Sequence, residues 1–198
     1  MKKLTLATLS TLALSLLCTS VFAVDGKITV NGVVTDQTCT LQGYQGPVTG
    51  VKDLTVSMPA VLKSEFNSSI LTAKPKYIQM RITNATGTGW CNAATTAAFK
   101  GIHLSVSSPP NDLDTTDKSL LVNKAEGAPT INPVFIQIRT GKNRIIDFSA
   151  PWGTQAASEI LISTFFSVVD YYVMYASKTG IVAPQNVHAV VNYTMHYN

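Results

Sequence analysis

Short runs in which apolar and polar residues alternate recur along most of the chain. In the run 76–83, KYIQMRIT, Tyr77, Gln79 and Arg81 alternate with apolar residues. This two-residue period is typical of a β-strand with one buried face. Further strands are predicted, between turn residues, at 27–41, 52–59, 101–107, 119–123, 133–148 (a hairpin turning at 140–143), 165–177 and 187–198.

The first residues follow a different pattern. Lys2 and Lys3 precede an apolar run, and a motif of small residues ends at Ala23. The run is about 14 residues long, which is short for a membrane span. We therefore predict a cleaved signal peptide at 1–23. A lipid anchor on Cys18 is a less favoured alternative, because a large residue precedes it.

Composition narrows the class of protein. Removing 23 of the 198 residues leaves 175, enough for one domain with its own core. The formal charge of +4 falls to +2 without Lys2 and Lys3, and the remaining basic residues are scattered. We therefore expect no nucleic-acid binding. The glycines of 86–92 are not followed by a phosphate-binding helix, so we expect no nucleotide either.

Two of the three cysteines, Cys39 and Cys91, lie beyond the predicted signal peptide. In an oxidising compartment two cysteines usually pair, so we predict a disulfide between them. A metal site or a catalytic thiol is the alternative, disfavoured because no histidine cluster lies nearby. Helix patterns are weak and short, at 58–70 and 154–164. Many strands, few helices and one bridge indicate an all-β, immunoglobulin-like sandwich.

Both ends of the predicted mature chain carry strands with one apolar face. At the start, apolar or small residues alternate with polar ones at Val24, Gly26, Ile28, Val30 and Gly32. At the end, one face carries Val187, Ala189, Val191, Tyr193, Met195 and Tyr197. No residues follow to form a strand that would cover this last run, so we expect an open apolar groove along it.

Sequence motifs for catalysis are weak. No nucleophile elbow is present, and Asp112, Asp114 and Asp117 lack the spacing of a calcium loop. The three histidines lie apart on the polar side of strand-like runs, at His103, His188 and His196. We interpret them as solvated strand residues and expect no enzyme activity, no metal and no cofactor.

The chain resembles the pilin subunits of chaperone–usher fimbriae, the type 1 and P pilus kind. The resemblance rests on GKITVNGVVTDQTC at the start, FIQIRTGKNRIIDF in the middle and YYVMYASKTGIVAPQNVHAVVNYTMHY at the end. It implies an immunoglobulin-like sandwich that lacks its last strand, in a pilin domain at 35–198. It also implies an N-terminal donor-strand extension at 24–34, with Gly26 at a position where the family keeps glycine.

The resemblance further implies how the subunit assembles. The extension of one copy would fill the groove of a neighbouring copy, with Ile28 and Val30 in the deeper pockets and Val24 where exchange starts. A periplasmic chaperone would first cover the groove and hold the C-terminus at Tyr197 and Asn198, and an outer-membrane usher would catalyse exchange. The fimbria would then stand on the cell surface and support adhesion.

Alternatives remain at this point. The first strand can instead fold back into its own sheet. The chain can be a tip adhesin or a polyadhesive subunit that binds a host receptor, although its length fits one domain only. The third hypothesis is that the protein is an unrelated secreted enzyme or a solute-binding sandwich.

Overall fold

The computed structural model describes residues 39–162 and 167–197 of the chain. Its strands in these ranges are β1 (Cys39–Gln45), β2 (Val48–Thr49), β3 (Thr55–Val56), β4 (Thr72–Asn84), β5 (Phe99–Ser105), β6 (Leu120–Leu121), β7 (Phe135–Thr140), β8 (Ile160–Ile162), β9 (Ser167–Ala176) and β10 (Asn192–Tyr197). The helices are short: the 3-10 turn η1 (Lys63–Glu65), α1 (Ala93–Ala98) and α2 (Pro109–Asp112). The predicted all-β class is confirmed.

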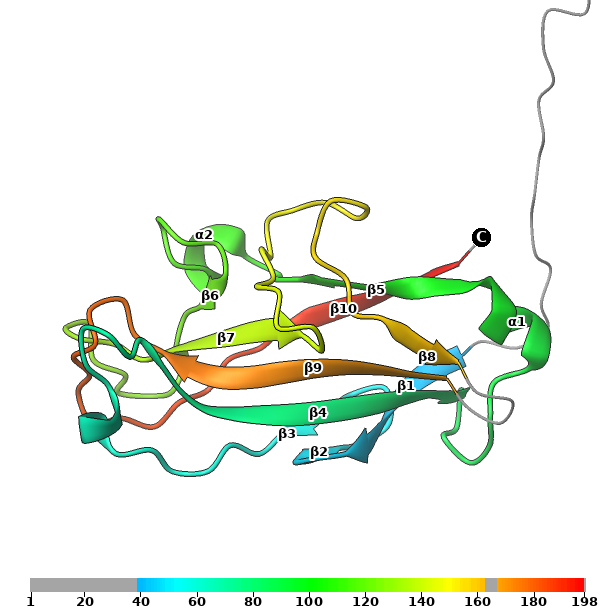
Figure 1. The fold of residues 1–198 in the computed structure, drawn as a ribbon, viewed down its shortest axis with the longest axis horizontal. Coiled ribbons are helices and arrows are strands. Elements are labelled where there is room, and N and C mark those ends of the chain that lie inside the picture. The colour runs from blue at the N-terminus through cyan, green and yellow to red at the C-terminus, as the bar shows by residue number, and fades with distance from the viewer. Residues whose placement is uncertain (1–38, 163–166, 198) are drawn as a thin grey trace, which may run out of the picture. The chain divides into compact units, whose positions relative to one another are not determined.

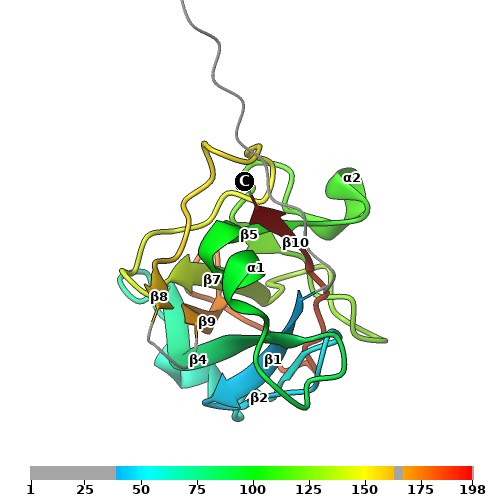
Figure 2. The same ribbon diagram turned by 90° about the vertical axis from the view of Figure 1, so that its right-hand side faces the viewer.

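The strands form two main antiparallel sheets (Figure 1). The larger sheet has the order β1-β4-β9-β7-β6, with β8 also paired to β9, and β5 and β10 form the smaller sheet. Viewed along the strands, the smaller sheet faces the larger one as a second layer (Figure 2). Strands β2 and β3 pair with each other as a separate short ribbon.

Strand β4 has the two faces that its sequence predicts. Ile78, Met80 and Ile82 are buried at 5%, 7% and 2% exposure and join the hydrophobic core. Tyr77 and Arg81 lie on the opposite face, where polar side chains bond to each other. The core thus lies between the inner faces of the two sheets.

A proline interrupts the pairing of β4 near its start. The register with β9 shifts between Ala73 and Lys76, and Lys74 has a positive φ of 52°. Pro75 has no backbone N–H to donate to the neighbouring strand. A bulge at this position therefore sacrifices no hydrogen bond from that residue. The bulge lets a 13-residue strand continue through a proline.

Two local predictions differ from the structure, and one helix is not expected from the sequence. The expected helix at 154–164 is absent from the described part of that range, where β8 pairs with β9 instead. The second arm of the hairpin at 133–148 is reduced to an isolated bridge between Arg139 and Ile145. Helix α1 was not predicted, although Asn92 caps it by accepting a hydrogen bond from the Thr95 N–H at 2.8 Å.

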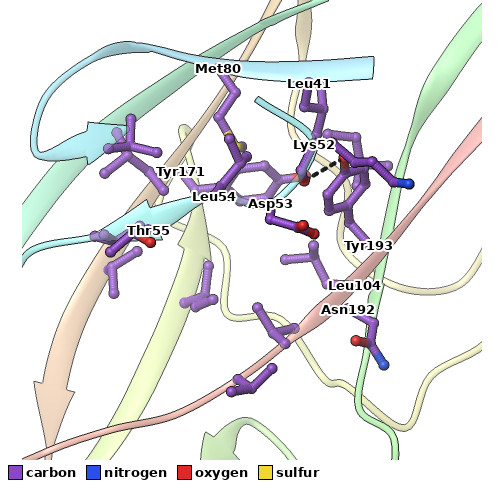
Figure 3. Close-up of a pocket in the computed structure, with 18 of the residues that line it drawn as sticks. Leu41, Lys52, Asp53, Leu54, Thr55, Met80, Leu104, Tyr171, Asn192 and Tyr193 are labelled. Carbon is purple, nitrogen blue, oxygen red and sulfur yellow. Dashed lines mark hydrogen bonds between the residues drawn. The ribbon is translucent and has the colours of Figure 1, made fainter. Parts of the chain in front are cut away.

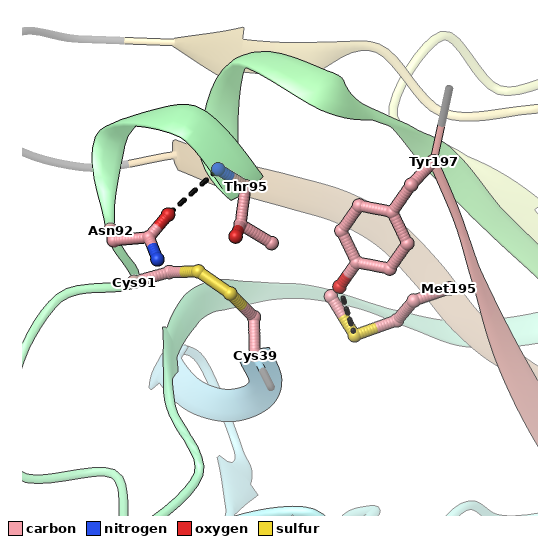
Figure 4. The surroundings of a disulfide bond; sticks show 6 residues. All are labelled: Cys39, Cys91, Asn92, Thr95, Met195 and Tyr197. Carbon is pink, nitrogen blue, oxygen red and sulfur yellow. Dashed lines mark hydrogen bonds between the residues drawn. A yellow bond between two sulfur atoms is a disulfide. The ribbon is translucent and has the colours of Figure 1, made fainter. Parts of the chain in front are cut away.

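The predicted disulfide between Cys39 and Cys91 is present, with Cα atoms 5.6 Å apart (Figure 4). It joins the first residue of β1 to the residue before the Asn92 cap of α1. No helix in the described ranges is long and apolar enough to cross a membrane.

Candidate functional site: a groove beside the last strand

The segment that leads into β10 and β10 itself turn alternate side chains toward the core. The residues predicted for the groove edge at Val187, Ala189, Val191, Tyr193 and Met195 are half-buried and pack against core residues. The residues between them, from His188 to Thr194, are exposed. Tyr197 is 39% exposed at the end of the strand. The period-two pattern of the sequence is therefore also the pattern of burial.

The second wall of the groove comes from the segment 50–56, which ends in β3. This segment is attached to β1 by two backbone hydrogen bonds. The Gly43 N–H donates to the Gly50 carbonyl oxygen at 3.0 Å, and the Lys52 N–H donates to the Leu41 carbonyl oxygen at 2.8 Å. The wall is thus held to the edge of the larger sheet.

Between these walls lies a groove of about 1420 Å³ (Figure 3). Its floor is made of core side chains from both sheets, among them Leu41, Met80, Leu104 and Tyr171. The Tyr171 hydroxyl is uncharged at neutral pH, and burial raises its pKa further above the ordinary value. The groove therefore opens directly onto the hydrophobic core.

One edge of β10 is paired and the other lies along the groove. In its antiparallel register with β5, Tyr193 is opposite Leu104 and Met195 is opposite Ile102. No other strand of the described residues pairs with β10. A strand edge with unpaired backbone groups is a template for adding another strand.

Two curated proteins are similar to the chain over most of their length. The major fimbrial subunit SMF-1 of Stenotrophomonas maltophilia is 28% identical over 180 residues, which cover 89% of this chain and 94% of that protein. The F17 fimbrial protein of Escherichia coli is 26% identical over 178 residues, covering 88% of each. No protein-family model matches the chain.

Two solved structures share the fold of the chain. The P pilus rod subunit PapA aligns with a TM-score of 0.55 at 17% identity, covering 87% of this chain and all of PapA. A subunit from a chaperone–usher pilus structure concerned with rod uncoiling aligns with a TM-score of 0.50 at 18% identity, covering 87% of this chain and 95% of that one. The chain is similar to fimbrial subunits over most of its length, and it shares the fold of the two solved pilus subunits. These similarities support a structural role in surface fimbriae rather than an enzymatic one, and we refer to the chain as the pilin.

At the far end of β10 the pilin packs its aromatic residues against each other. The Tyr197 ring meets Phe99 edge-on at 5.7 Å between centroids, and its hydroxyl donates to the Met195 sulfur at 3.6 Å. Burial, and then the neighbouring Tyr193, raise the pKa of Tyr197. Figure 4 draws this tyrosine near Cys39, so the described chain begins at the end of the domain where β10 finishes.

The predicted donor positions Val24, Gly26, Ile28, Val30 and Gly32 lie outside the described residues of the pilin, as does Asn198. Their roles therefore stay predictions.

Two of the pilin's histidines are not the solvated residues that the sequence suggests. His196 stacks on Trp152 with centroids 3.9 Å apart and ring planes 3° apart. The His103 Nε2 atom lies 2.9 Å from the Ala150 carbonyl oxygen. Both contacts attach the 149–157 loop to the outer face of the smaller sheet. Only His188 is exposed.

The acidic loop of the pilin is organised around one carboxylate. Asp114 accepts hydrogen bonds from the Lys178 ammonium at 2.9 Å and from Thr116 and the Asp117 N–H. Burial alone would raise the pKa of Asp114, but these bonds outweigh it and hold the pKa well below its ordinary value. In the described ranges no three histidine, cysteine or acidic side chains gather as a metal site.

The sequence predicts a strand at 52–59 but does not indicate that the segment 50–56 forms the second wall of the groove. Residues 50–53 contain no apolar period, and Lys52 has a positive φ of 65° that few residue types adopt. Gly50, with a φ of 100°, was the only local signal of an irregular backbone there. The floor residues from β5, Ile102 and Leu104, were predicted as one strand face but not as part of a site.

Proposed function

We propose that this pilin polymerises by donating residues 24–32 of one copy to the groove beside β10 of the next. The observation that carries the proposal is an apolar groove that opens onto the core along the unpaired edge of β10. In this proposal the domain is an immunoglobulin-like sandwich without its last strand, and the added strand completes it. The rod-subunit likeness supports assembly with further copies.

The proposed donor has the pattern that the groove requires. A strand lying beside β10 would turn every second side chain to the core floor. Val24, Ile28 and Val30 would supply apolar side chains, and Gly26 would allow close backbone approach. The polar residues between them, such as Lys27 and Thr29, would face solvent.

The energies are sufficient for a long-lived joint. Burying each large apolar side chain contributes roughly 1.5–3 kcal/mol, and each net ladder hydrogen bond about 0.5–1.5 kcal/mol. Three such side chains and some eight bonds give on the order of 10–20 kcal/mol before the cost of ordering the strand is subtracted. Separating two subunits would then mean removing a strand from a core, which is slow.

A free subunit with this groove would expose core residues and an unpaired edge, both of which favour aggregation. We therefore include a periplasmic chaperone that covers the groove before assembly and contacts the end of the chain at Tyr197 and Asn198. An outer-membrane usher would exchange the chaperone for the next subunit. Neither step requires a metal or a nucleotide in the pilin.

Cysteine cross-linking between differently tagged copies tests the proposal. One copy carries Val30→Cys, the other Val191→Cys, and the native cysteines stay in their disulfide. In mixed fibres we expect a reducible dimer that contains both tags. A link that forms inside a single copy carrying both substitutions, and no link between copies, would show that the strand folds back onto its own domain.

Deletion of residues 24–31 is the complementary test. The shortened subunit should still be recovered with its chaperone, because the groove is intact, but it should form no fibres in electron micrographs. Replacing Gly26 with leucine should slow assembly, because a side chain would keep the backbone from the groove. Normal fibres from the deletion variant would contradict the donor assignment.

A further inference from the structure

A single hydrogen bond connects the two walls of the groove. The Tyr193 hydroxyl, on the inner face of β10, donates to the Lys52 carbonyl oxygen at 2.8 Å (Figure 3). The bond lies at the exposed mouth of the groove, and both residues line it. It joins residues 141 positions apart in the chain.

The segment 50–53, which we name the strap, holds the Lys52 carbonyl in place. Besides its two bonds to β1, the strap contains a tight turn in which the Asp53 N–H donates to the Val51 carbonyl oxygen at 2.8 Å. Lys52 itself has a left-handed backbone. A non-glycine residue in this conformation carries some strain, so the surrounding bonds must hold it there.

This contact occupies the place where a strand would be added to β10. An inserted strand would run between β10 and the strap, one strand spacing of about 4.8 Å from β10. Its inward side chains would also occupy the space that the Tyr193 ring crosses to reach Lys52. The walls can therefore be joined by this bond or separated by a strand.

Building on the proposed donor groove, we propose that Tyr193 is a gate residue for strand uptake. Its bond to Lys52 closes the groove of a subunit that holds no strand, and the bond breaks when a strand enters. The gate thus sets the rate of uptake and does not stabilise the filled joint. Because the bond is exposed to solvent, its effect is modest: a net hydrogen bond corresponds to roughly a two- to tenfold change in rate.

Uptake kinetics of a labelled peptide of residues 24–34 by the mature chain test the gate. The mature chain is used dilute, with the peptide in excess, and fluorescence reports association and dissociation separately. Tyr193→Phe keeps the ring and removes only the hydroxyl, so it should bind the peptide about two- to tenfold faster with an unchanged dissociation rate. Tyr77→Phe is the matched control, since it removes a hydroxyl that donates to Asp170 at 3.1 Å outside the groove; its association rate should equal that of the wild type.

The possible outcomes distinguish the gate proposal from the donor-groove proposal. Uptake at equal rates by wild type and Tyr193→Phe would overturn the gate alone. A change confined to dissociation would also overturn it, because the bond would then belong to the filled state. No uptake by any variant would overturn the donor groove and the gate with it.

A spectroscopic measurement gives a second readout. In protein with ¹³Cζ-labelled tyrosine, the Tyr193 signal, assigned from its absence in Tyr193→Phe, reports hydrogen bonding of the hydroxyl. We expect this signal to shift when the peptide is added, while the Tyr77 signal stays in place. A Tyr193 signal that does not move on peptide binding would show that the bond persists, and the gate would be wrong.

Discussion

Removing the disulfide between Cys39 and Cys91 should destabilise the subunit by an amount that the structure predicts. Both cysteines are buried, at 6% and 9% exposure, and the bridge attaches the start of β1 to the residue before the α1 cap. Alanine is the appropriate replacement, because serine would bury a hydroxyl without a partner. We consider Cys39→Ala, Cys91→Ala and the double variant.

The magnitude follows from the loop that the bridge closes. The cysteines are separated by 52 positions. On the chain-entropy model, a loop of this length stabilises the folded state by about 4 kcal/mol. Because the bridge is a single object, each single variant loses all of it. The three variants should therefore lose similar amounts, and the two single losses should not add.

Urea unfolding of the subunit measures this loss. Trp90, directly before Cys91, is one of two tryptophans and a natural fluorescence probe. With a urea slope of about 2 kcal/mol per molar, the midpoint should fall by roughly 2 M in all three variants. Losses that add in the double variant would refute the reasoning, and so would a urea midpoint that falls by less than about 0.5 M. Two free thiols in the unfolded wild type without reductant would show that the bridge is not formed.

Three further predictions concern other parts of the domain. Ile146, at 0% exposure, is a core residue, so Ile146→Ala should cost about 2–5 kcal/mol in urea unfolding, whereas Ile145→Ala at a half-exposed position should cost less than about 1 kcal/mol. Hydrogen bonds depress the pKa of Asp114 in the folded state, so its contribution to stability is present above the unfolded value of 3.8 and is lost as pH falls below it. Asp114→Asn should therefore flatten the decline in stability on acidification, and an unchanged decline would contradict the bonds described. Trp152→Ala should move the His196 ring-proton signals downfield, because the stacked indole shields them; unmoved signals would mean that the stack does not form in solution.

The alternating strands were predictable because their signal is local. In β4 each side chain's burial follows from its position in a period of two, as Ile78 and Met80 show. The pairing of Cys39 with Cys91 was predictable because the choice was between one bridge and none. The apolar face at 187–195 was visible for the same reason as β4.

Features that depend on distant partners were not predictable. The range 154–164 has a weak helical period, but Ile160 pairs with Val169 of β9, and this tertiary pairing determines the local structure. The strap is a stronger case, because the left-handed Lys52 is held by bonds to β1 that no local pattern encodes. The Tyr193 hydroxyl bond to Lys52 joins residues 141 apart and could be seen only in the folded domain.

The contrast between β9 and β10 connects folding with assembly. On β9 the inner residues Val169, Tyr171 and Val173 are 5% exposed or less, whereas Val191 and Tyr193 face the same core and remain half-buried. Apolar surface that stays exposed beside the core contributes nothing to the folding free energy of a single copy. If a strand from a second copy fills the groove, that free energy stabilises the joint instead. A substitution that fills the groove from within should then raise the stability of the lone subunit and lower its ability to assemble, so the two properties should change in opposite directions.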